Sequence, residues 1–308
     1  MNEKESITSF IELISRSINS KSSLNAVPAQ TQKLNGIVNH GLTLYSEGTN
    51  IAPVIYLNEF YKRYQSGELT IDSIRDQILA SYESLSKPNI PDLDRFMSSS
   101  QFIDNITIRL VNAEINMPMI NSKGLIYHTV TGTDLLCLFY AVIHMDNCSF
   151  GGIALTTSLL EHYLPDYTDA DILFAEVIRR IPKNTLMLKS ITNVLREAFS
   201  ANMDMPIPEP SDDYLYVLSN TSKLYGASAI LTDAGRKMIC ELFPDGKVTM
   251  LPSSIHEVLL LKTKDNEDVN AFKTMVMEIN RNEVPQEDFL SDNVYHYDAN
   301  TGILTIAE

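Results

Sequence analysis

The sequence predicts an α+β fold made of repeated strand–strand–helix units, with mainly antiparallel sheets and helices packed on one face. Short runs of large apolar and β-branched residues recur along the chain, as is typical of strands. Amphipathic stretches with helical spacing follow most of these runs. Clusters of Gly, Pro, Asn and Asp separate them, which favours short connections and antiparallel neighbours.

The first 90 residues are expected to hold a helix, a linker and one α+β unit. Apolar side chains at helical spacing predict an amphipathic helix over 3–19. The polar stretch 20–33 is interpreted as a linker, so 1–34 comprises this helix and the linker. The helix either docks on the body of the protein or serves as a contact arm. The unit at 35–90 is predicted to contain strands at 42–45 and 54–57 and helices at 58–65 and 70–85.

A second α+β unit is expected over 91–205, after a boundary that prolines mark at 87–91. Its predicted elements are a helix at 92–116, strands at 127–130, 135–145 and 150–155, helices at 156–163 and 172–178, and a strand and helix within 185–199. The segment 150–156 echoes 225–232, so the chain has a weak internal repeat. Duplication and recurrence of the same local capping chemistry both explain this echo.

The third unit, 206–308, follows a connector at 203–212 that contains three prolines. Thr232 is expected to cap a helix, because a threonine hydroxyl accepts hydrogen bonds from the free N–H groups of a first turn. The predicted elements are strands at 214–218, 225–231, 247–251 and 257–262, helices at 232–243 and 269–279, and a terminal hairpin over 294–306.

Several motifs of this C-terminal part carry a family resemblance. They are Tyr216-Val217-Leu218, Leu224-Tyr225-Gly226-Ala227, Leu251-Pro252-Ser253-Ser254-Ile255-His256-Glu257-Val258 and Leu290-Ser291-Asp292-Asn293-Val294-Tyr295. On these motifs the chain resembles an uncharacterised family of anaerobic Gram-positive bacteria, a domain of unknown function. The resemblance covers most of the chain after about residue 35. The resemblance implies a bacterial protein. It identifies no catalytic residues, because none are established for the family.

Charge and composition limit the classes of partner. The formal net charge is −15, which disfavours binding to a nucleic-acid backbone or to an anionic membrane. No apolar run reaches membrane-spanning length, and the charged start lacks a signal-peptide core, so we expect a cytoplasmic protein without membrane contact. The excess of acidic residues indicates a soluble acidic surface. Two more specific interpretations are that this surface binds a basic protein partner or that it mimics the charge of a nucleic acid.

The sequence holds one compact set of a nucleophile, a base and an acid, formed by Ser253 or Ser254 with His256 and Glu257. A hydrolase needs a serine within hydrogen-bond reach of a histidine that a carboxylate orients. Neighbouring strand residues point to opposite faces, so His256 and Glu257 diverge if both lie in a strand. The alternative interpretation is a turn in which the serine hydroxyls bind backbone amides.

No cofactor or metal is predicted, because the sequence contains no glycine-rich phosphate loop, HExxH or CxxC spacing. Two of the three cysteines, Cys137 and Cys240, lie in apolar surroundings and are expected to be buried free thiols. Our leading expectation is a non-enzymatic accessory or regulatory factor that binds another protein. The alternatives are a hydrolase that uses the 253–257 corner and an acidic mimic of nucleic acid.

Overall fold

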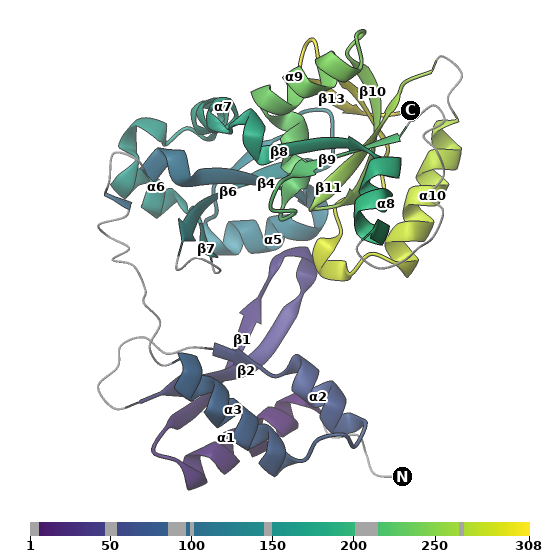
Figure 1. The fold of residues 1–308 in the computed structure, drawn as a ribbon. Helices are drawn as coiled ribbons and strands as arrows, with labels where there is room; N and C mark the ends of the chain where they lie inside the picture. The colour runs from purple at the N-terminus through teal and green to yellow at the C-terminus, as the bar shows by residue number, and fades with distance from the viewer. Residues whose placement is uncertain are drawn as a thin grey trace. The chain divides into compact units, whose positions relative to one another are not determined.

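The computed structural model describes residues 6–46, 54–85, 97–98, 102–144, 150–200, 215–264 and 268–308. The chain divides into two compact units, Met1–Ile90 and Pro91–Glu308 (Figure 1). All pairings between the described strands are antiparallel, and helices accompany the sheets in both units, so the predicted α+β class is confirmed. The predicted boundary at 87–91, the connector at 203–212 and Cys148 lie outside the described residues.

The smaller unit is a three-stranded sheet with helices on one face. Its strands lie in the order β1 (Asn25–Gln32), β2 (Val38–Tyr45) and β3 (Val54–Tyr56). The helices are α1 (Ile7–Lys21), α2 (Asn58–Gln65) and α3 (Ile71–Leu85). The apolar sides of these helices pack against the inner face of the sheet and form a hydrophobic core. The largest residues of this core include Phe10, Ile14, Ile18, Leu42, Leu44, Leu57, Ile74 and Ile78.

The predicted linker at 20–33 is wrong, because most of it forms the edge strand β1. Two side chains of α1 hold this strand in place. The Ser15 hydroxyl donates to the Ala26 carbonyl oxygen at 2.7 Å, and the Asn19 amide oxygen accepts from the Ala26 N–H at 2.6 Å. Most β1 residues face solvent, so the strand is polar and its composition imitates a linker.

The larger unit contains a six-stranded sheet with the order β13-β12-β10-β11-β9-β8. Its strands are β8 (Leu186–Ser190), β9 (Leu215–Asn220), β10 (Lys247–Ser254), β11 (Glu257–Lys262), β12 (Tyr295–Asp298) and β13 (Ile303–Ile306). Helix α10 (Val269–Asn282) packs on the face that contains Leu251 and Leu261. Helix α9 (Asp233–Leu242) lies on the opposite face with Met250 and Leu260, so helices cover both faces here and not one.

A second sheet of this unit is centred on β6 (Leu135–His144). It pairs with β4 (Ile106–Asn112) along one edge and with β5 (Tyr127–Thr129) and β7 (Phe150–Ala154) along the other. The predicted strands at 127–130, 135–145 and 150–155 are therefore confirmed. Around the two sheets lie α5 (Ala113–Lys123), α6 (Thr157–Tyr163), α7 (Ala170–Arg180) and α8 (Ile191–Ser200).

The predicted helix at 92–116 is wrong over β4, and a helix begins only at Ala113. Apolar side chains in this stretch fit a helical spacing, but Ile106, Ile108 and Leu110 also alternate with Thr107 and Arg109. Pairing with β6 selects the strand. The register sets Thr107 opposite Tyr140 and Arg109 opposite Leu138, so these four residues share one face of the sheet.

The predicted strand at 225–231 is also wrong, because Gly226–Leu231 forms the 3-10 helix η5. This helix buries Ala227, Ala229 and Ile230 in the core that both sheets share. The echo between 150–156 and 225–232 therefore joins segments of different structure, one a strand and one a helix. The cap that follows is confirmed, since the Thr232 hydroxyl accepts from the Gly235 N–H at 2.9 Å at the start of α9.

Candidate functional site

The predicted corner lies at the turn between β10 and β11, where His256 has a bonding partner on each ring nitrogen. Nδ1 accepts from the Tyr225 N–H at 3.0 Å, so the proton is assigned to Nε2, which donates to Asp288 at 3.0 Å. Neither serine hydroxyl is bonded to the ring. The structure thus joins His256 to Tyr225 and Asp288, which are distant in sequence.

The two serines of the corner make local bonds. The Ser254 hydroxyl accepts from the backbone N–H of His256 at 3.0 Å. The Ser253 hydroxyl donates to the Glu257 carboxylate at 3.3 Å. The corner therefore brings Ser253 and Glu257 together, and it uses Ser254 to shape the turn.

The His256 ring supports a strained turn that runs from Asn220 to Gly226. Lys223 and Tyr225 both have left-handed backbone conformations, with φ of 54° and 57°. Such conformations cost roughly 1 kcal/mol or more for residues other than glycine. The Asn220 amide clamps the turn, accepting from the Leu224 N–H at 3.1 Å and donating to the Leu224 carbonyl oxygen at 2.7 Å.

A cavity of about 380 Å³ lies between this turn and the sheet face that carries Arg109, and we call it the Arg109 cavity. Strands β4 and β6 supply Thr107, Arg109 and Tyr140 to its wall. The turn supplies Leu224 and Tyr225. One motif of the family resemblance, 224–227, therefore lines this cavity, and the bond between Tyr225 and His256 connects it to a second motif, 251–258.

Among the described residues, no Asp or Glu is paired with Arg109. Its guanidinium carbon lies 4.1 Å from the centre of the Tyr225 ring, a cation–π contact. Its Nε atom is buried and has no hydrogen-bond partner. None of the described residues that line the cavity is Asp or Glu. An arginine in this setting can bind a carboxylate or a phosphate through its planar fork of N–H donors.

Tyr140 adds a hydroxyl beside this cation. Burial raises the pKa of Tyr140 above its usual value, and the nearby positive charge of Arg109 partly opposes that increase. The Tyr140 hydroxyl therefore stays protonated in neutral solution and offers a neutral donor at the same wall.

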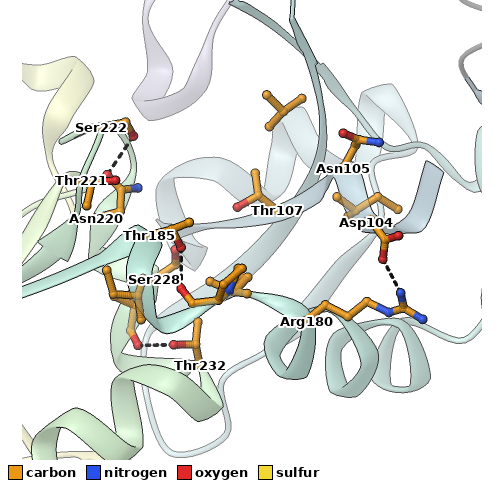
Figure 2. A pocket seen from close by; sticks show the side chains of 17 residues that line it. Asp104, Asn105, Thr107, Arg180, Thr185, Asn220, Thr221, Ser222, Ser228 and Thr232 are labelled. Atoms are coloured by element: carbon orange, nitrogen blue, oxygen red, sulfur yellow. Dashed lines mark hydrogen bonds and ion pairs between the residues drawn. The ribbon is translucent and has the colours of Figure 1, made fainter. Parts of the chain in front are cut away.

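A second cavity of about 340 Å³ adjoins the first and shares Thr107, Val142, Asn220 and Ser222 with it. Figure 2 shows its lining. Six of the described lining residues are Ser or Thr, and we call it the hydroxyl cavity. The two charged residues there, Asp104 and Arg180, form an ion pair with each other, and Arg180 also binds Glu176. The described part of its lining therefore presents hydrogen-bonding groups without an unpaired charge.

The sequence interpretation did not identify Arg109 as a site residue. The signal was present in the alternation of Ile106, Ile108 and Leu110 with Thr107 and Arg109, which is typical of a half-buried strand. This alternation was not recognised, because the stretch was interpreted as a helix. The contact between Arg109 and Tyr225 could not be predicted, because it depends on long-range packing. Within the described ranges, no group of three His, Cys, Asp or Glu side chains is placed to hold a metal ion.

In the part of the chain that the structure describes, no helix combines the length and apolarity required to cross a bilayer. No curated protein matches the chain, and no solved structure matches it. A family model does match it, over residues 7–299. The predicted membership of an uncharacterised family is confirmed, and the chain belongs to DUF5688, a family of unknown function.

Proposed function

We propose that this protein acts by binding and that its larger unit holds a small anionic ligand in the Arg109 cavity. One observation carries the proposal: a guanidinium with a buried, unbonded Nε lines a cavity in which no described residue is acidic. The Arg109 side chain is partly buried, and the loss of hydration around a cation costs free energy when no counter-ion replaces the water. A bound carboxylate or phosphate would offset that cost.

The net negative charge of the larger unit strengthens the argument from Arg109. By sequence, the larger unit has 16 Lys or Arg against 30 Asp or Glu, a net charge of −14, whereas the smaller unit has 8 against 9. Acidic side chains are thus abundant in the larger unit, and other arginines, such as Arg180, have carboxylate partners. Arg109 has none among the described residues, which supports a role in recognising an external anion.

The accessory role predicted from the sequence remains part of this proposal. A cytoplasmic bacterial protein that binds a small anion can regulate a protein partner, and the charge of the larger unit favours a basic one. The hydrolase alternative has less support, because a general base needs a ring nitrogen that is free to take a proton. At His256, Tyr225 and Asp288 engage both nitrogens. No observation favours the nucleic-acid mimic.

The test is calorimetric titration of the full chain with inorganic phosphate, ethyl phosphate and acetate, in a buffer free of other anions except chloride. We expect binding of at least one probe with a Kd on the order of 1 mM, which is typical of very small ligands. Arg109→Gln should abolish it. Arg281→Gln is the matched control, because it removes one positive charge from the same unit at an exposed position outside the cavity.

Two results would contradict the proposal. One is the absence of heat and of any thermal shift for every probe with the unmodified chain. The other is equal binding by the Arg109→Gln and Arg281→Gln variants, which would indicate a nonspecific electrostatic effect.

A further inference from the structure

We infer that the ligand is a hydroxylated anion, in which a phosphate or carboxylate is joined to a sugar or another polyol. The anionic group binds at Arg109, and the hydroxylated part occupies the hydroxyl cavity. This inference rests on the proposed function, because it extends the ligand from the same arginine.

The first argument is continuity. Four residues, Thr107, Val142, Asn220 and Ser222, line both cavities. A ligand held at Arg109 can therefore extend past Asn220 and Ser222 without leaving the protein wall. Each cavity, at about 340 and 380 Å³, is in the range of small-molecule sites. A free phosphate would use only a small part of this space.

The second argument is the direction of the hydrogen bonds in the hydroxyl cavity. Thr185 donates its hydroxyl hydrogen to the Pro182 carbonyl oxygen at 2.7 Å, and Ser228 donates to the Tyr225 carbonyl oxygen at 3.1 Å. Ser222 donates to the Asn220 side-chain oxygen at 2.9 Å. A hydroxyl group has one hydrogen and two lone pairs, so these side chains retain acceptor capacity after donating.

This wall therefore suits a ligand part that carries several donors. Sugar hydroxyls meet that need, because each can donate to a protein oxygen. An ammonium group fits less well, since the carboxylate of Asp104 is paired with Arg180 and leaves no free negative charge. An apolar group would leave the remaining lone pairs of these hydroxyls without a donor.

The experiment compares matched anions by calorimetry on the full chain. Ribose 5-phosphate is compared with ethyl phosphate, and gluconate with acetate, so that each pair differs in hydroxyl content and the two pairs distinguish phosphate from carboxylate. We expect the hydroxylated member of at least one pair to bind about tenfold more tightly, the gain that two net hydrogen bonds provide. Ribose alone should bind weakly, since it lacks the anionic anchor.

A substitution then tests whether the higher affinity of the hydroxylated anion arises in the hydroxyl cavity. Thr185→Val removes an exposed acceptor and keeps the side-chain shape, so it should lower affinity for the hydroxylated anion about fivefold. It should leave ethyl phosphate or acetate unaffected. Thr274→Val is the control, because Thr274 lies on α10 and lines neither cavity.

The outcomes separate this inference from the proposed function. If ethyl phosphate and ribose 5-phosphate bind equally, gluconate and acetate bind equally, and Arg109→Gln abolishes binding, the inference is wrong and the anion site stands. Equal losses for both members of a pair in Thr185→Val would also overturn it. If no anion binds the unmodified chain, both proposals fail.

Discussion

The Arg109 guanidinium lies over the Tyr225 ring, with 4.1 Å between the guanidinium carbon and the ring centre, although β4 and the strained turn are far apart in sequence. Tyr225 presents this ring from a left-handed backbone conformation, with φ of 57°. The pairing thus combines a cation that has no carboxylate partner among the described residues with a strained residue, two features that cost stability and that cluster at functional sites.

We predict that Arg109→Met makes the ligand-free protein more stable. The substitution removes a charge without a carboxylate partner and keeps a flexible apolar stem against the Tyr225 ring. The free energy of unfolding should rise by about 1 kcal/mol, the low end of the gain found when buried charged groups are replaced by apolar ones, because Arg109 is only partly buried. Urea denaturation in a buffer without phosphate measures it. A loss of 1 kcal/mol or more would instead make Arg109 a structural residue.

Gly226→Ala should be strongly destabilising. A Cβ at this position would lie 2.6 Å from the Asn220 nitrogen and 2.6 Å from the His256 carbonyl oxygen, and it would clash with the Ser219 hydroxyl. The backbone atoms cannot move away cheaply, so we expect a loss of about 3 kcal/mol. Gly152→Ala is the control, because its nearest neighbour would be 3.7 Å away. Thermal unfolding of both variants tests the difference, and similar melting temperatures would contradict it.

His256→Ala should cost about 2 kcal/mol, because the Tyr225 N–H loses its acceptor. His256→Asn should cost less, since the asparagine side-chain oxygen can occupy the position of Nδ1 and accept from the same N–H. Chemical denaturation of the two variants measures the difference. Hydrogen exchange at the Tyr225 amide should be faster in the alanine variant than in the asparagine variant; equal rates would exclude the bond as the cause.

The larger unit should lose stability in alkaline solution, above about pH 10. Burial and the charge of Asp134 raise the pKa of Tyr295, whose hydroxyl donates to the Asp134 carboxylate. The folded state therefore keeps this proton at a pH where the unfolded chain, with a tyrosine pKa near 10, releases it. The unfolded state then binds fewer protons, so the free energy of unfolding falls as pH rises.

Tyr295→Phe isolates this contribution. The variant should be about 1 kcal/mol less stable at pH 7, because a hydrogen bond is lost. Above pH 10 its stability should fall less steeply than that of the unmodified chain, by about 1.4 kcal/mol per pH unit. Denaturation curves between pH 7 and 11 give both slopes. Parallel slopes would show that Tyr295 ionises normally in the folded protein.

Local chemistry made much of the fold predictable from sequence. Thr232 caps α9 as its position indicated, and the terminal hairpin forms where its turn residues stand. The failures arose where a local pattern has two solutions. Residues 106–110 fit a helix and a strand, and only pairing with β6 decides between them. Residues 226–231 form the 3-10 helix η5, whose Ala227, Ala229 and Ile230 are buried in the shared core.

The candidate site depends even more on long-range structure. His256 and Glu257 are adjacent in sequence, yet the partners of the His256 ring are Tyr225 and Asp288. Arg109 reaches Tyr225 because two sheets and η5 pack around one core. A sequence motif can propose neighbours along the chain, but it cannot supply those that packing brings together.

The edge strand β1 has a consequence for how copies of this protein behave at high concentration. The smaller unit has a net charge of −1 by sequence, so electrostatic repulsion does little to keep two such units apart. Pro28 stands in the middle of β1 and has no N–H to offer an incoming strand. The free edge of the sheet is thus a poor template for an added strand. Pro28 therefore protects a unit whose net charge is near zero from intermolecular β-sheet pairing.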